Sequence, residues 1–374
     1  MSVDTATQQG VKLDPTGVTG LRLYTRGPVT LPWLSRHIVP VARTLADVSG
    51  RVVYLRHGWR NGPHVDIVAR RAFGPVPPWH VLAAELDAGA LDPTTAMTEQ
   101  QYLAQAAELS RLENVPGPYT PFHQHGVVAT LSAEEIVTDH PGLDQLRDVV
   151  FGVTGKPLMR TIDEVAAEPE IAVTRLAEAF VALADTHPLG VAYGALSLRC
   201  HSEGFLAGMG PRRQVRTTFD HRLLKEAHLF REVVQRRLDD RPGPTATAWR
   251  TAMAYCGGAL DHAAATGFLT TKLLDSASGG VRRDDLPNET PAAPDSPFQR
   301  ALAASLRDSE PSPFFAPYRL LTNLFYQQLP LLTVSPLQRY YMCHAIAETV
   351  DEILGQTWED RLVTQQWELA AFAQ

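Results

Sequence analysis

The stretch at residues 312–354, SPFFAPYRLLTNLFYQQLPLLTVSPLQRYYMCHAIAETVDEIL, restricts the fold more than any other part of the chain. Pro317 suits the first turn of a helix, because proline lacks the N–H that would have no partner there. Pro330 should end or kink that helix. Ser335 can cap a second helix, and Gly355 is placed to stop it. The sequence therefore predicts two helices joined by a short proline-containing bend.

These two expected helices present phenols and an imidazole, with no evident carboxylate or cysteine nucleophile. Tyr318 and Tyr326 lie eight residues apart and share one helix face. Tyr340 and His344 are neighbours on the second helix, and Tyr341 follows Tyr340 directly. One interpretation is a proton-donating site. The other is that the tyrosines are half-buried core residues whose hydroxyl groups reach water.

The composition excludes several classes of protein. The 374 residues are 44% hydrophobic and 20% charged, which is typical of a globular protein of one large domain or two. The formal charge of −7 does not suggest a cationic nucleic-acid surface. Three widely spaced cysteines argue against a disulfide framework or a Cys-rich zinc site. No signal pattern or membrane-length apolar run is present, so we expect a cytoplasmic protein.

The pattern along the chain predicts an α+β protein, mainly helical, with a small sheet near the N-terminus. Alternating or apolar runs predict strands at 20–25, 51–55, 65–69 and 126–131. Helical spacing covers 31–48, 79–88, 98–111 and most of the chain from residue 133, including a helix that opens at Thr161 and is interrupted at Pro169. Residues 275–297 are rich in Gly, Pro, Ser and Asp and predict a mobile loop.

A turn at Asn61-Gly62 joins two of the expected strands and gathers basic side chains around it. The potential cations at this turn are Arg56, His57, Arg60 and His64. Such a group needs anionic or carbonyl-rich partners. The alternative is a solvated hairpin edge that is protected by its charge.

A second polar group lies in SLRCHSEGFL, residues 197–206, where Arg199, His201 and Glu203 alternate. On a strand these side chains would face one way, whereas on a helix they would fan out. A buried, internally hydrogen-bonded network is the alternative to a binding site. The chain has no nucleotide-binding motif, and the pairs His57 with His64 and His123 with His125 have no convincing third ligand, so we predict no metal site.

Together, three segments resemble one known family: YLRHGWRNGPHV at 54–65, SLRCHSEGFL at 197–206 and the helix pair beginning YRLLTNLFYQQ at 318–328. The chain is similar to elimination-domain-like proteins of ribosomal peptide maturation. These include the glutamate-eliminating domain of class I lanthipeptide dehydratases and the stand-alone pyridine synthases of thiopeptide pathways. The polar N-terminal residues predict a disordered tail at 1–19. The resemblance implies one catalytic domain at 20–374, with its sheet in 20–131 and its helical part in 132–374.

One departure distinguishes the two branches of this family. Lanthipeptide eliminases resemble one another in a closing H-x-H-x-N-R segment, and the matching residues 323–328 here read NLFYQQ. The histidines and the arginine are absent, and Tyr326 and Gln327 are similar to the pocket lining of the pyridine synthases. The resemblance therefore implies a pyridine synthase.

The implied reaction joins two dehydroalanines of a modified precursor peptide into a six-membered nitrogen heterocycle, with loss of water and of the leader peptide. It requires no cofactor, because it needs no redox step or electron sink. The implied partners are the leader and core of an azole- and dehydroalanine-containing peptide, with no nucleic acid or membrane; a homodimer is left open. Two other functions stay open: a lyase that eliminates glutamate from glutamylated Ser or Thr, and a non-catalytic peptide-binding protein of a maturation complex.

The resemblance also implies site residues. The expected proton donors and their companions are Tyr318, Ser312, Tyr341 and Tyr340. The expected substrate-binding residues are Arg56, His64, His201, Glu203, Tyr326 and Gln327. The N-terminal strands and the charged segment 222–237 are candidates for leader binding.

Overall fold

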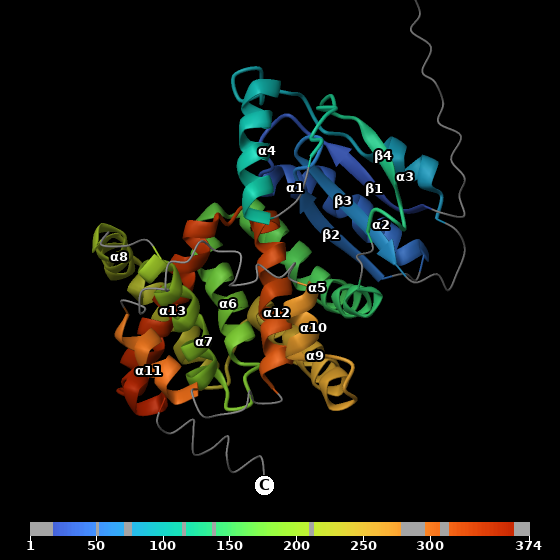
Figure 1. The fold of residues 1–374 in the computed structure, drawn as a ribbon. Coiled ribbons are helices and arrows are strands. Elements are labelled where there is room, and N and C mark those ends of the chain that lie inside the picture. Colours follow the sequence, from blue (N-terminus) through green and yellow to red (C-terminus); the bar gives the residue numbers. More distant parts are fainter. Residues whose placement is uncertain are drawn as a thin grey trace, which may run out of the picture.

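A computed structural model gives the fold of the protein. The structure describes residues 18–49, 52–70, 77–113, 117–136, 140–208, 213–277, 296–306 and 314–362. The tail expected at 1–19 and the loop expected at 275–297 lie mostly outside these ranges, and so does Ser312. Figure 1 shows the sheet and the helical part as two neighbouring regions of the molecule.

The N-terminal part is a four-stranded antiparallel sheet with the order β2-β3-β1-β4. The strands are β1 (Val18–Tyr24), β2 (Val52–Gly58), β3 (His64–Arg70) and β4 (Val128–Ser132). Asn61 and Gly62 take positive φ angles of 65° and 122° in the turn between β2 and β3, a conformation that Asn and Gly adopt readily. The four strands predicted from the sequence are therefore confirmed.

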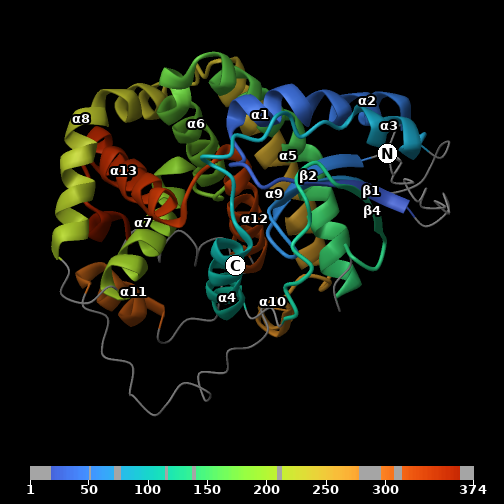
Figure 2. The same cartoon turned by 90° about the horizontal axis from the view of Figure 1, so that it is seen from above.

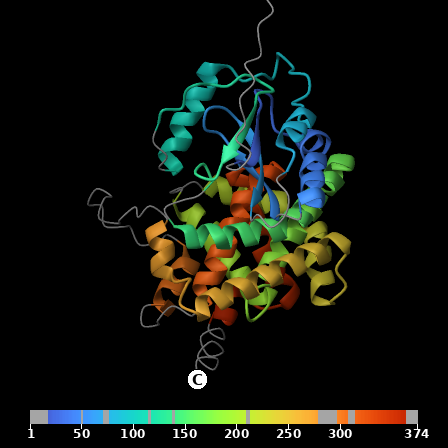
Figure 3. The same ribbon diagram turned by 90° about the vertical axis from the view of Figure 1, so that its right-hand side faces the viewer.

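Helices cover the sheet on both faces. On one side lie α1 (Leu31–His37), α2 (Val39–Ser49) and α3 (Trp79–Glu85), which bury the apolar face of the strands (Figure 2). On the other, Tyr54 of β2 packs its ring edge against Phe151 of α5 (Pro141–Ala167), with ring centroids 5.4 Å apart. Figure 3 shows α5 running beneath the sheet, where it joins the sheet to the helical part.

Helix α4 (Glu99–Glu113) lies beside the sheet, and the remaining helices form the helical part around α6 (Figure 1). Their bounds are η1 (Pro169–Ile171), α6 (Ala172–Ala184), α7 (Val191–Gly208), α8 (Arg213–Leu238), α9 (Pro244–Ala265), α10 (Thr271–Ala277), α11 (Pro297–Leu306), α12 (Phe315–Gln328), η3 (Leu329–Leu332) and α13 (Pro336–Leu354). In α6, every residue from Leu176 to Ala184 is buried, because α7, α8, α9 and α13 surround it. None of the helices described is long and apolar enough to cross a membrane.

One helix boundary predicted from the sequence is wrong. The helix expected to open at Thr161 has already begun at Pro141, and Thr161 lies inside α5. The break expected at Pro169 is present, since α5 ends at Ala167 and α6 begins after η1. Pro157 did not interrupt α5, because tertiary contacts bury that part of the helix.

The expected helix pair at the C-terminal end is confirmed. Helix α12 ends at Gln328, two residues before Pro330, and η3 follows. The Ser335 hydroxyl accepts the N–H of Gln338 at 3.2 Å and so caps α13. Gly355 ends α13 in the left-handed conformation, with φ of 60°.

Gly194 sets how closely α7 approaches the end of α6. A Cβ atom on Gly194 would lie 1.9 Å from the carbonyl oxygen of Ala184, far inside van der Waals contact. Only glycine permits this approach. The contact fixes the position of α7, which carries the expected site residues His201 and Glu203.

We therefore predict that Gly194→Ala destabilises the protein by about 3 kcal/mol or more, because the added methyl group forces the two helices apart. Gly258→Ala in α9 is the matched control. A Cβ there meets no atom within 4 Å, and alanine favours helix over glycine by about 1 kcal/mol. Urea unfolding of both variants measures the difference. Equal stability of the two variants would contradict the close approach of α7 to α6.

Candidate active site

Long side chains from α7, α12 and α13, with one residue preceding α7, form a group of phenols, imidazoles and a guanidinium. We call this group the tyrosine cluster. Its members are Tyr318, Tyr326, Tyr340, His187, His201, Arg339 and Cys343. The sequence predicted four of these seven as site residues, and the structure brings those four together.

Tyr326 lies at the centre of the tyrosine cluster. Its hydroxyl shares a hydrogen bond of 3.2 Å with the thiol of Cys343, and its ring meets His201 edge to face at 5.3 Å between centroids. Burial raises the pKa of Tyr326 well above its ordinary value and raises the pKa of the Cys343 thiol to about 12. Both groups therefore keep their protons at neutral pH, so Cys343 is no thiolate nucleophile.

The Tyr318 hydroxyl has no hydrogen bond of ordinary geometry. Its oxygen is buried and lies near the Ser197 side chain, without a well-formed bond to any described residue. Burial raises the pKa of Tyr318, and the Ser197 side chain opposes this shift only in part. Because a buried donor without a partner costs free energy, a substrate oxygen placed here would be bound favourably.

The two imidazoles of the tyrosine cluster are neutral at neutral pH. Burial lowers the pKa of His187 and of His201 to about 4, and the positive charge of Arg339 adds to the shift of His201. The backbone N–H of Leu189 donates to Nδ1 of His187 at 3.2 Å, so the ring proton lies on Nε2. The His187 ring contacts Tyr318 edge to face, with centroids 5.8 Å apart.

The adjacent residues Tyr340 and Tyr341 lie in different environments. The Tyr340 ring stacks on Phe205 at 4.1 Å and lies in the tyrosine cluster. Tyr341 is buried against α8, where its hydroxyl donates to Glu226 at 2.7 Å and Arg222 stacks on its ring. The structure therefore separates these two expected proton donors, and of the two only Tyr340 shares Arg339 with Tyr326.

Arg56 and His64 lie on the sheet, apart from the tyrosine cluster. The buried carboxylate of Asp66 accepts hydrogen bonds from Arg56 at 2.8 Å and from Arg22 at 2.7 Å. His64 Nδ1 donates to the Gly62 carbonyl at 2.8 Å, and burial lowers its pKa to about 4. Of the four potential cations expected at this turn, His64 is therefore neutral at neutral pH. Sequence reasoning missed Asp66, which follows His64 by two residues. Its carboxylate balances part of the positive charge at this turn.

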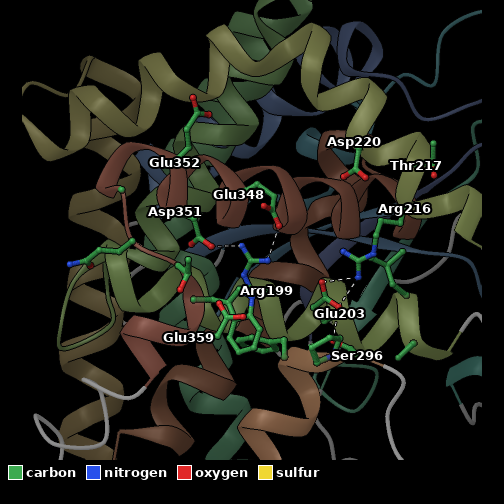
Figure 4. A pocket seen from close by; sticks show the side chains of 18 residues that line it. Arg199, Glu203, Arg216, Thr217, Asp220, Ser296, Glu348, Asp351, Glu352 and Glu359 are labelled. Carbon is green, nitrogen blue, oxygen red and sulfur yellow. Dashed lines mark hydrogen bonds and ion pairs between the residues drawn. The ribbon is translucent and has the colours of Figure 1, made fainter.

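Glu203 faces a different region from His201. Because α7 is a helix, residues 201 and 203 fan out, as expected for that alternative. Glu203 lines a cavity of about 1140 Å³ between α7, α8, α11 and α13 (Figure 4). Its carboxylate accepts hydrogen bonds from Arg216 at 2.7 Å and from Ser296 at 2.7 Å.

Ion pairs join several of the charged side chains in the wall of this cavity. Arg199, only 5% exposed, donates to Glu348 at 2.7 Å and to Asp351 at 2.8 Å. Figure 4 shows these pairs and the Arg216–Glu203 pair as separate groups along the wall. A ligand that used Arg199, Arg216 or Glu203 would therefore have to replace an existing ion pair.

The other expected site residues contribute less. Gln327 is exposed beside Tyr326, and Ser312 lies outside the described residues. Within the described ranges, no three His, Cys, Asp or Glu side chains are grouped closely enough to bind a metal ion.

Sequence reasoning missed Arg339, Cys343 and His187. Arg339 directly precedes Tyr340 in the first turns of a capped helix, which is the one signal that could have indicated it.

We predict that His201 makes the protein sensitive to mild acid. In the unfolded chain the imidazole takes up a proton below its ordinary pKa of 6.5, whereas the folded pKa is about 4. Stability is therefore lost as the pH falls from 6.5 towards 4, and by pH 5 this histidine accounts for about 2 kcal/mol. In His201→Gln the loss of stability between pH 7.5 and pH 5 should be smaller by that amount.

Urea unfolding at both pH values measures this effect. His221→Gln is the matched control, because this histidine of α8 is exposed. A pH dependence of His201→Gln that equals the wild-type one would show that His201 is not a buried neutral imidazole.

The similarity of this protein to known proteins lies in its fold and not in its sequence. No protein-family model and no curated protein matches the chain in sequence. Several solved structures match it in fold, and these include two that each cover more than 90% of this chain. One is the pyridine synthase TbtD from thiomuracin biosynthesis, with a TM-score of 0.63, 20% identity and coverage of 91% of this chain and 99% of TbtD. The other is TsrL, with a TM-score of 0.57, 16% identity and coverage of 92% and 96%. The α+β fold expected from the sequence is thus confirmed, and the chain has the fold of the pyridine synthase TbtD.

Proposed function

We propose that this protein is a pyridine synthase that forms the central six-membered nitrogen heterocycle of a thiopeptide. The observation that supports the proposal most is the match to TbtD, which extends over nearly the full length of both chains. The chemistry of the tyrosine cluster adds to it, because this reaction needs proton donors and orientation more than it needs a nucleophile.

The proposed reaction begins with two dehydroalanines of one peptide. One alkene, with the adjacent amide in its iminol form, supplies a 2-azadiene, and the other alkene supplies the two remaining ring carbons. Two C–C bonds form and close the ring. The hydroxyl group then leaves as water with the C–O electron pair, and a ring carbon loses a proton. Finally the leader peptide leaves as an amide with a second ring proton, which makes the ring a pyridine. The balance requires no oxidant or reductant.

Tyr318 is the proposed donor to the amide oxygen. Its buried hydroxyl lacks a well-formed hydrogen bond to any described residue, and its raised pKa keeps the proton in place until an oxygen with developing negative charge accepts it. Tyr340 is the proposed second acid, because Tyr341 already donates to Glu226 on another face of α13. Ser312 stays the proposed companion of Tyr318, and the neutral His201 orients the core peptide.

The rival lyase function has weaker support. Glutamate elimination needs cations for the leaving carboxylate, and the residues available for this are Arg56, Arg60 and His64. The structure pairs Arg56 with Asp66, and burial keeps His64 neutral. The turn therefore has less free positive charge than the sequence suggested, and the tyrosine cluster offers phenols instead.

We predict that the wild-type protein converts an azole-bearing peptide with two dehydroalanines into a pyridine macrocycle and releases the leader as a C-terminal amide. Tyr318→Phe should slow this by about 10²- to 10⁴-fold, because it removes a general acid while keeping the ring. Tyr255→Phe is the matched control, since that tyrosine of α9 is 64% exposed. Mass spectrometry of timed samples follows both products.

The same experiment separates the alternatives. New alkenes in an otherwise intact glutamylated peptide would indicate the lyase. Tight binding without any change in mass would indicate a peptide-binding protein. Turnover by Tyr318→Phe at the wild-type rate would remove Tyr318 from the proposed mechanism while leaving the proposed function in place.

A further inference from the structure

Arg339 is a half-buried cation without a counter-ion. Its guanidinium carbon lies 4.8 Å from the ring centroid of Tyr326 and 4.6 Å from that of Tyr340. Its Nε atom is buried and has no hydrogen-bond partner, and no described carboxylate forms an ion pair with it. Two aromatic rings thus hold the guanidinium in place, while its donors stay unused by the part of the protein that the structure describes.

Other arginines near the same helix are bound differently. Arg222 also stacks on a tyrosine ring, that of Tyr341, but it forms an ion pair with Glu226 at 3.0 Å. Arg199 forms ion pairs with two carboxylates. Because a partly buried guanidinium without a hydrogen-bonding partner is costly, arginines in such places usually have one. The missing partner of Arg339 points to a ligand oxygen.

We propose that Arg339 binds the amide oxygen of the core peptide, the oxygen that later leaves as water. This inference rests on the proposed function and adds a residue to the same site. The guanidinium donates N–H groups to this oxygen and stabilises its negative charge as the amide shifts to the iminol form and again as the C–O bond breaks. Arg339 gives up no proton, and the proton that completes the water comes from a phenol such as Tyr318.

The surroundings of Arg339 suit this role. His187 and His201 are neutral, and Tyr326 and Cys343 keep their protons, so the guanidinium is the one permanent charge in the tyrosine cluster. In a partly dehydrated site a single charge acts more strongly than in water. The two rings fix it before the substrate arrives, so little reorganisation is needed when charge develops.

The test compares Arg339→Met, Arg339→Lys and the control Arg160→Met. Methionine keeps apolar contact with the two rings but removes the charge. Lysine keeps the charge but loses the planar fork. Arg160 lies on α5 in a surface ion pair with Glu164, remote from the proposed chemistry. Each protein is checked for an unchanged melting temperature. Binding of a fluorescein-labelled peptide with azoles and two dehydroalanines is then measured by anisotropy, and leader release is measured under single-turnover conditions.

We expect Arg339→Met to weaken peptide binding about tenfold and, with saturating peptide, to slow leader release by about 10²- to 10³-fold. Arg339→Lys should recover at least tenfold of the lost rate. A purely structural role would lower the melting temperature without this additional loss of rate at saturation. Leader release by Arg339→Met at the rate of Arg160→Met would overturn the inference.

The binding measurement keeps the two proposals distinguishable. If the wild-type protein releases no leader, the proposed function fails, and anisotropy alone then decides the role of Arg339. Weaker binding by Arg339→Met than by Arg160→Met would support a contact with the peptide, and equal binding would rule it out.

Discussion

The burial of α13 among its neighbours is the constraint on which the rest of the helical part depends. Helix α13 packs on α6, α7 and α8, and every residue from Tyr341 to Ala347 is buried. In its first turns Arg339 and Tyr340 are half-buried. This packing places Tyr341 against α8, where it bonds to Glu226, and places Arg339 against Tyr326 of α12. The tyrosine cluster lies where the core of the helical part ends.

Removal from water is the common cause of the unusual chemistry in this cluster. It lowers the pKa of the imidazoles and raises the pKa of the phenols and of the thiol, so that each group is held in its neutral form. Neutral proton donors beside one fixed cation suit a reaction in which charge develops briefly on an oxygen. Such a set of neutral donors is much less suited to a reaction that begins with an ionised nucleophile. This agreement between the electrostatics and the proposed ring closure does not depend on the likeness of fold.

Local signals in the sequence were sufficient for much of the fold, and contacts between distant segments were not. The cap at Ser335 and the stop at Gly355 depend on neighbouring residues and were predicted correctly. The partner of Tyr341 is Glu226, 115 residues away, so no local pattern indicated that Tyr341 leaves the site. Arg339 went unnoticed for a related reason. An arginine at a helix start is ordinary, and it becomes informative only once the fold shows that no carboxylate meets it.

The cavity lined by Glu203 and the tyrosine cluster make different use of charge, and this difference favours the cluster as the place of the proposed reaction. In the cavity wall, Arg199 and Glu203 already have partners, so a ligand would have to displace existing ion pairs (Figure 4). In the tyrosine cluster, the Tyr318 hydroxyl and the Nε of Arg339 lack a well-formed hydrogen bond to any described residue. Arg339 also lacks an ion pair there, whereas Arg199, whose Nε is unpartnered as well, forms two. Since unmet polar groups in a partly dehydrated place cost stability, their presence is better explained by a substrate than by folding. By the same argument, Glu203 is already held by Arg216 and Ser296, and contact with the core peptide stays a prediction for this residue.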